Sequence, residues 1–144
     1  MTSFPLLAPH KWRPLGAAWA IALVSSLVVL FIGEVMGQAP CELCWFQRAF
    51  MFPLAIILGI AAFKSDRTVV PYGLALAAGG GLAALYHSLL YAGVIAAPII
   101  PCTGGPSCSG ESMTIGGVPL PLLSLVAFAL ILTFLLNFQR RLKS

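Results

Sequence analysis

Four cysteines are the residues of this chain best suited to chemistry, and they occur as two close pairs. Cys41 and Cys44 form a C-x-x-C pair directly after Pro40, whereas five residues separate Cys102 from Cys108. Closely spaced thiols form and exchange disulfides, which persist in an oxidising compartment. The two pairs therefore indicate thiol–disulfide chemistry in such a compartment, which for a bacterial cell is the periplasm or the cell exterior.

The C-x-x-C pair is expected in the opening turn of a helix, because proline favours the first helical turn. Unpaired backbone N–H groups and the helix dipole favour a thiolate there, so at least one of the two thiols should be reactive. Arg48 follows Cys44 by four residues and lies one turn away on the same face. It is either an interface anchor or a group that stabilises negative charge on Cys44 or on an adjacent electron acceptor.

His87 is a second polar residue expected near this pair. It follows the inner end of its apolar stretch by about 18 residues, or roughly 27 Å along a helix, and so reaches the depth of Arg48. It is either a buried histidine with one hydrogen bond or a donor to a carbonyl of a bound cofactor. Glu34 could pair with Arg48 or His87, although a hydrated carboxylate at the membrane interface is favoured.

Other uses of paired cysteines fit the spacing less well. A Cys102–Cys108 bridge closes about seven residues and would contribute roughly 2.4 kcal/mol, which suits exchange better than stapling, although a structural clip stays open. A zinc site made from both pairs would have a second spacing of about two to four residues, and haem attachment needs a histidine where Trp45 stands. No metal is therefore expected. The alternative is a non-enzymatic membrane protein with structural disulfides, which leaves Arg48 and His87 unexplained.

The elements that must position these residues are membrane helices. Hydrophobic residues make up 60% of the 144 residues and charged residues only 8%, against about 25% charged in a soluble domain. Four apolar stretches are long enough to cross about 30 Å of hydrocarbon, namely 15–33, 45–63, 69–91 and 118–138. We therefore expect an all-α membrane protein. Residues 1–144 would form a single membrane domain, a four-transmembrane-helix bundle with outer loops 34–44 and 92–117, and the glycines at 79–81 would let helices approach closely.

The basic residues set the expected orientation. Seven of the eight fall before the first stretch, between the second and third, or after the fourth. Basic residues favour the cytoplasmic side, so both termini are expected inside (N-in/C-in) and all four cysteines outside. The net charge of +4 is thus a topology signal, and no nucleic-acid partner is expected. The first stretch is too long for a secretory signal and lacks a small-x-small cleavage site, so we expect it to stay uncleaved.

The motif around the first cysteine pair resembles that of a known family. The sequence PCELCWFQR at 40–48, followed by MFPL at 51–54, is similar to the disulfide bond formation protein B (DsbB) family, and more closely to its short BdbC-like branch. The similarity extends through residues 86–87 and the second cysteine pair to residues 119–128. The chain departs from the family at Ser88, which replaces an aromatic residue, and at 116–117, where two glycines replace bulkier residues.

The resemblance implies a multi-pass membrane thiol oxidoreductase of the bacterial plasma (inner) membrane, in contact with membrane lipid and with its redox loops on the periplasmic or outer side. Such a protein would reoxidise a secreted, DsbA-like thioredoxin-fold dithiol partner by disulfide exchange. It would pass the electrons to a membrane quinone, either ubiquinone or menaquinone, and so support disulfide bond formation in exported proteins.

The resemblance also assigns roles to the cysteines, all four of which would be catalytic. Cys102 would take the partner's attack, with Cys108 as its bridge partner. Cys41 would then exchange with that loop pair and leave Cys44 to face the quinone.

Arg48 and His87 are the quinone-binding residues that the resemblance implies. Arg48 would stabilise the negative charge that develops as Cys44 gives electrons to the quinone ring, and His87 matches a family histidine near the quinone. A member of the vitamin K epoxide reductase family is a third interpretation. It is disfavoured because the C-x-x-C of that family is expected near its last helix rather than its second.

Overall fold

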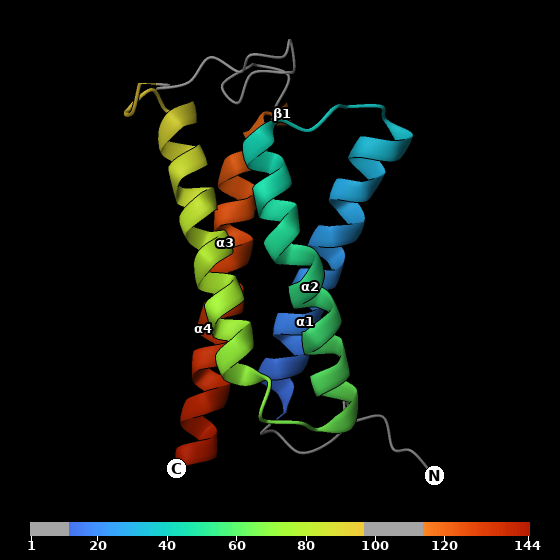
Figure 1. Cartoon of the computed structure of the whole chain (residues 1–144), viewed down its shortest axis with the longest axis vertical. Coiled ribbons are helices and arrows are strands. Elements are labelled where there is room, and N and C mark those ends of the chain that lie inside the picture. The colour runs from blue at the N-terminus through green and yellow to red at the C-terminus, as the bar shows by residue number, and fades with distance from the viewer. Residues whose placement is uncertain (1–11, 97–113) are drawn as a thin grey trace.

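The structure is a computed structural model that describes residues 12–96 and 114–144. Four long helices run alternately up and down in one bundle (Figure 1). The elements in chain order are α1 Arg13–Leu30, the π-helical turn η2 Phe31–Val35, α2 Glu42–Lys64, α3 Val70–Tyr91, β1 Thr114–Ile115, β2 Val118–Pro119 and α4 Leu120–Lys143. Cys102 and Cys108 lie outside the described residues, so their expected roles stay predictions.

All four helices are long and apolar enough to cross a membrane, with α1 and η2 counted together as Arg13–Val35. Large apolar side chains cover the outer surface, for example Ile56 at 64% exposure and Leu82 at 68%. An exposed apolar surface of this extent is stable only in lipid, where a helix satisfies its own backbone polar groups. The expected all-α, four-transmembrane-helix fold is confirmed.

The bundle is a ring in which α1 and α3 each pack on both α2 and α4. Its core holds fully buried side chains from α2 and α4, including Leu54, Leu58, Phe128 and Ile131. The α2–α3 connection lies at the same end as the start of α1 and the end of α4, and the start of α2 lies at the other end (Figure 1). This arrangement puts Cys41 and the end of α3 at one end of the bundle.

Helix boundaries differ from the apolar stretches by several residues. The second helix begins at Glu42 rather than at residue 45, because Cys41 caps it: the backbone N–H of Cys44 donates to Cys41 Sγ at 3.4 Å. The fourth helix begins at Leu120 rather than at residue 118, because Val118 and Pro119 form a strand, and it continues to Lys143. Hydropathy marks the membrane-buried part of a helix, whereas capping and polar end turns set its actual ends.

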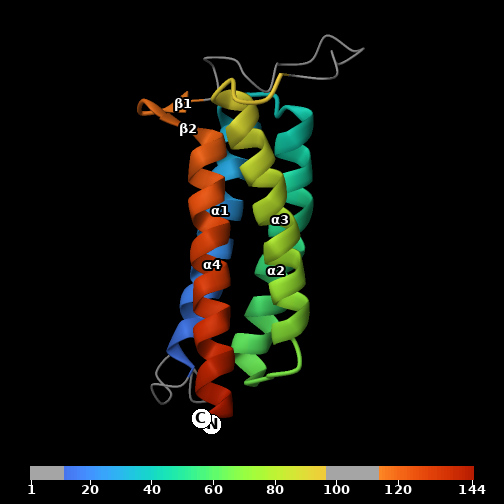
Figure 2. The same ribbon diagram turned by 90° about the vertical axis from the view of Figure 1, so that its left-hand side faces the viewer.

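A short β-hairpin leads into α4 (Figure 2). Ile115 pairs with Val118 across a two-residue turn of Gly116 and Gly117, whose φ angles are +58° and +84°. Two positive φ angles are typical of a type I′ turn, which matches the twist of the strands and favours glycine. The glycines that depart from the family pattern therefore build this turn, and the hairpin enters α4 at the end of the bundle that carries the cysteine pair.

Close packing of α3 depends on two of its three consecutive glycines. A Cβ atom placed on Gly79 would come within 2.8 Å of the Phe50 ring of α2, and one on Gly80 would overlap the buried Phe128 ring of α4. These glycines let aromatic rings of both neighbouring helices reach the α3 backbone. The close approach of neighbouring helices at these glycines is the one expected from the sequence.

Candidate redox site

The cysteine pair forms the first turn of α2. Cys41 is the N-cap residue and is 2% exposed, whereas Cys44 is half-buried one turn into the helix. Their sulfur atoms lie 3.0 Å apart, and Cys41 Sγ also accepts the Cys44 N–H. The first N–H groups of a helix have no partner within the helix, so a sulfur atom at this position is held where negative charge is stabilised. The Cys41 sulfur is in this position, because it accepts one of these N–H groups.

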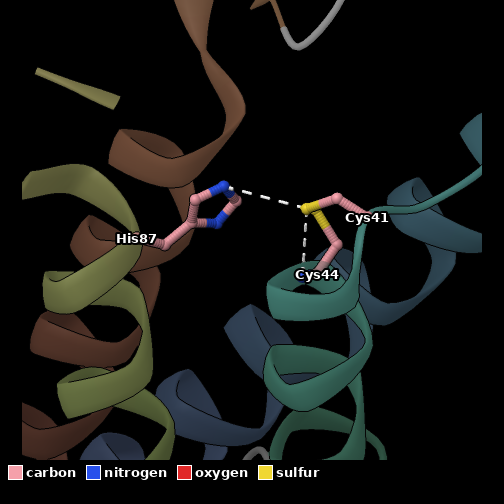
Figure 3. Close-up of side chains that lie close together, drawn as sticks. All are labelled: Cys41, Cys44 and His87. Atoms are coloured by element: carbon pink, nitrogen blue, oxygen red, sulfur yellow. Dashed lines mark hydrogen bonds between the residues drawn. The ribbon is translucent and has the colours of Figure 1, made fainter. Parts of the chain in front are cut away.

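His87 comes to the pair from α3 and is fully buried. Its Nε2 lies 3.9 Å from Cys41 Sγ, and Figure 3 shows the imidazole directed at the sulfur. Its Nδ1 lies 2.9 Å from the amide nitrogen of Gln47. With the amide in this orientation its nitrogen donates to Nδ1 and the ring hydrogen lies on Nε2, facing Cys41, whereas the reversed amide orientation goes with the other tautomer. The resemblance places His87 at a quinone, and the structure adds a contact with the cysteine pair.

Gln47 is the site residue to which the sequence analysis gives no role. It lies on α2, is only 8% exposed and hydrogen-bonds His87 across the α2–α3 interface. The sequence does carry one signal, an uncharged amide three residues after Cys44 in a mostly apolar helix. A polar side chain in a membrane helix usually has a bonding partner. The sequence does not show that this partner is His87.

Arg48 is held on the other side of the cysteine pair, against α1. Its NH2 group donates to the Val29 carbonyl at 2.9 Å, and its guanidinium carbon lies 5.7 Å from the centre of the Trp45 ring. A Cβ atom on Gly33 would lie 3.2 Å from the same NH2 group, so the bare backbone at Gly33 leaves room for the guanidinium. Gly33 belongs to the π-helical turn η2, a feature frequent at functional sites.

A pocket of about 280 Å³ joins these groups. Its apolar walls come from the end of α1, the α1–α2 connection and the start of α4, with Val29, Ile32, Ala39, Pro40, Leu120 and Pro121. Its polar groups are Gln38, Cys44, Gln47, Arg48, His87 and Ser124. Small-molecule sites are typically apolar clefts of about 300–1,000 Å³ with a few convergent polar groups. The pocket is slightly smaller than that range and suits the head group of an apolar molecule.

The structure thus brings Cys41, Cys44, Arg48 and His87 together at one end of the bundle. Glu34 is exposed, and Arg48 donates to the Val29 backbone carbonyl. The two sulfur atoms and a ring nitrogen of His87 also lie within 4.8 Å of one another, and all three are atoms that can bind a metal ion.

A bundle of four membrane-spanning helices with a cysteine pair at the mouth of its second helix defines a class, the membrane proteins of thiol–disulfide exchange. The chain belongs to the family of disulfide bond formation protein DsbB, whose family model matches residues 11–138. It is therefore a multi-pass membrane protein of disulfide formation. No solved structure matches the chain.

Relatives of this family are similar to the chain over most of its length. A probable disulfide formation protein of Metapseudomonas resinovorans is 58% identical over 132 residues, which cover 90% of this chain and 92% of its own. Disulfide bond formation protein C of Bacillus subtilis is 40% identical over 120 residues, or 83% of this chain and 87% of its own. A probable disulfide formation protein of Deinococcus radiodurans is 41% identical over 128 residues, which cover 82% of this chain and 83% of its own.

Proposed function

We propose that this protein reoxidises a secreted, DsbA-like thioredoxin-fold dithiol and passes the two electrons to a membrane quinone, ubiquinone or menaquinone. The observation that carries the proposal is the apolar pocket that Cys44 and Arg48 line together. Its setting would be the bacterial inner membrane, with the cysteine pair on the periplasmic or outer side. The oxidised partner would then introduce disulfides into exported proteins.

The residues around the pocket fit a quinone head group. Apolar side chains from α1 and α4 can hold a flat ring, and Arg48 can donate to a carbonyl oxygen. Its guanidinium has five N–H donors, of which the Val29 carbonyl takes one. The Ser124 hydroxyl is not a second donor in this arrangement, because it already donates to the Pro121 carbonyl at 2.8 Å.

The thiol steps follow from exchange chemistry. A partner thiolate attacks the Cys102–Cys108 disulfide, and the loop thiolate set free attacks Cys41 of the Cys41–Cys44 disulfide, so that Cys44 leaves with the electron pair. The second thiol of the partner attacks the mixed disulfide between partner and loop, which releases the oxidised partner and frees the second loop cysteine as a thiolate. This thiolate attacks the loop sulfur that is bonded to Cys41, which reforms the loop disulfide and releases Cys41. The Cys44 N–H and the His87 Nε2–H, which both face Cys41 Sγ, stabilise the negative charge on this leaving sulfur.

Cys44 is then the thiolate beside the pocket. A bound quinone would supply the acceptance of two electrons and two protons, after which the Cys41–Cys44 disulfide is formed again. Arg48 stabilises the negative charge on the pocket side of Cys44 in a site partly shielded from water. His87 and Gln47 also line the pocket, and the His87 imidazole is directed at Cys41, so the two sulfur atoms have different hydrogen-bonding surroundings.

The test is anaerobic quinone reduction driven by a reduced thioredoxin-fold partner. We expect Cys44→Ser to abolish the reaction and Arg48→Ala to lower its rate by about 10²-fold or more, the loss typical for a group that stabilises developing charge. Arg67→Ala is the matched control, since it removes an arginine from the α2–α3 connection at the opposite end. Full activity of Cys44→Ser would overturn the proposal. A non-enzymatic protein would reduce no quinone, and loss of Cys102 and Cys108 would change only its stability.

A further inference from the structure

Three metal-binding side chains converge at the mouth of α2. The sulfur atoms of Cys41 and Cys44 and a ring nitrogen of His87 all lie within 4.8 Å of one another. Tetrahedral Zn²⁺ binds thiolate at about 2.3 Å and imidazole at about 2.0–2.1 Å, which places its ligand atoms roughly 3.5–3.8 Å apart. The observed separations are 3.0 Å between the sulfurs and 3.9 Å between Cys41 Sγ and Nε2, one on each side of that range. The third separation, between Cys44 Sγ and the His87 ring nitrogen, is within 4.8 Å, so side-chain rotations that move these atoms by up to about 1 Å would complete the geometry.

Gln47 supplies a hydrogen bond to the ring nitrogen of His87 that would not bind the metal. A metal-binding imidazole usually holds its second nitrogen in a hydrogen bond, which fixes the tautomer and the ring orientation. Gln47 lies 2.9 Å from Nδ1, while Nε2 faces the cysteines. A 180° rotation of the Gln47 side-chain amide brings its oxygen next to Nδ1. The oxygen then accepts a hydrogen bond from Nδ1–H, and the Nε2 lone pair is left to bind a metal.

The charge of the group favours a divalent cation. Two thiolates and one neutral imidazole around Zn²⁺ form a neutral unit, whereas a monovalent cation would leave a net negative charge. Cys41 is 2% exposed and His87 is fully buried, and a buried net charge carries a large desolvation penalty. Thiolate and imidazole ligands are typical of tetrahedral Zn²⁺, so zinc is the occupant that fits the donor atoms.

We propose that the reduced Cys41–Cys44 pair and His87 form a zinc site. Binding of Zn²⁺ makes two Zn–S bonds and one Zn–N bond, releases two thiol protons to solvent and transfers no electron. These three ligands from the described residues leave a fourth position for water or another ligand. A disulfide offers no thiolate, so only the reduced chain binds zinc, and bound zinc keeps the pair from exchanging. The site does not depend on the proposed electron acceptor.

Metal titration of the purified full-length protein tests the site without any activity assay. Under anaerobic conditions, the reduced protein should bind one equivalent of Co²⁺ with a thiolate-to-cobalt charge-transfer band, and Zn²⁺ should displace the Co²⁺. Calorimetry of Zn²⁺ binding in two buffers of different ionisation enthalpy should give about two protons released at about pH 7. The same protein oxidised to the disulfide should show no band.

Variants locate the ligands. His87→Leu should abolish the charge-transfer band or weaken Co²⁺ binding at least 100-fold, and Gln47→Leu should weaken it about 10- to 100-fold. His10→Leu removes the other of the two histidines and should leave binding unchanged. The double variant Cys102→Ser/Cys108→Ser should also keep one equivalent. Binding that survives His87→Leu, disappears in the double variant or persists in the oxidised protein would overturn the proposal.

Discussion

At the scale of single residues, the two sulfurs of the C-x-x-C pair differ in their surroundings. Cys41 is buried and faces two donors, the Cys44 N–H and the His87 imidazole, whereas Cys44 faces the pocket. One sulfur thus lies against hydrogen-bond donors and the other lines the pocket. In the proposed reaction, the first would be a leaving group and the second would face the electron acceptor. This division of roles follows from helix capping, because the N-cap side chain turns back onto the helix terminus.

Gln47 should control how fast Cys41 reacts. Gln47→Leu removes the hydrogen bond that orients His87, and a bond of about 1 kcal/mol corresponds to a roughly five- to tenfold slower exchange at Cys41. The rate is measured as alkylation of Cys41 in a background where the other three cysteines are serine. Gln139→Leu, near the far end of α4, is the control. An unchanged rate in Gln47→Leu would show that the contact does not act on Cys41.

Arg48 should not be replaceable by lysine. Arg48→Lys keeps the positive charge but loses the planar group that bonds the Val29 carbonyl and stacks near Trp45. We expect the variant to fold, with the KM for quinone raised about tenfold and a smaller change in kcat. Steady-state kinetics with a varied quinone concentration separates the two constants. A variant with wild-type constants would reduce the role of Arg48 to its charge alone.

At the scale of the helices, α3 is fitted to its neighbours at individual backbone positions. Gly80→Ala would drive a methyl group into the buried Phe128 ring, and overpacking of this kind costs about 1–3 kcal/mol. Gly81→Ala is the matched control, because its Cβ would lie 3.6 Å from the Phe128 Cβ, an ordinary contact. We expect a lower thermal midpoint in detergent for the first variant and little change for the second. Equal midpoints would contradict the packing.

The α2–α3 connection carries a pH-dependent contact. The Asp66 carboxylate accepts hydrogen bonds from the Thr68 hydroxyl at 2.7 Å and the Thr68 N–H at 2.9 Å. These bonds, the hydroxyl first, hold the pKa of Asp66 below its ordinary value. A lowered pKa in the folded state stabilises the fold above the unfolded pKa of about 3.9, and this contribution is lost as the pH falls through the lower folded value. Thermal unfolding between about pH 6 and pH 3 should show this loss in the wild type and not in Asp66→Ala.

The sequence predicts the elements better than the contacts between them. Long apolar stretches determine four membrane helices, and Pro40 with the C-x-x-C spacing determines where the second begins. The contact between Gln47 and His87 could not be predicted, because it depends on the rotation of α2 against α3. The π-helical turn beside Arg48 could not be predicted either, since nothing in residues 31–35 marks a change of hydrogen-bond register.

At the scale of the whole molecule, most of the basic residues lie at one end of the described bundle and the cysteine pair lies at the other. The helix ends and the connection that carry Arg13, Lys64, Arg67 and Arg140 lie at one end, and the cysteine pair lies at the other. The up-and-down order of four helices makes this separation unavoidable, because each helix reverses the direction of the last. A thiol site at the mouth of α2 must therefore face away from the membrane side that holds the basic residues.

This separation gives the orientation of the protein a direct test. Basic residues are retained on the cytoplasmic side, so we expect the α2–α3 connection inside and the α1–α2 connection outside. In a background with all four cysteines changed to serine, Met36→Cys should react with a membrane-impermeant maleimide in intact cells. Ser65→Cys, exposed in the other connection, should react only after the membrane is permeabilised. The reverse labelling pattern would place the redox pair in the cytoplasm, where reduced thiols prevail, and would remove the compartment on which disulfide formation in exported proteins depends.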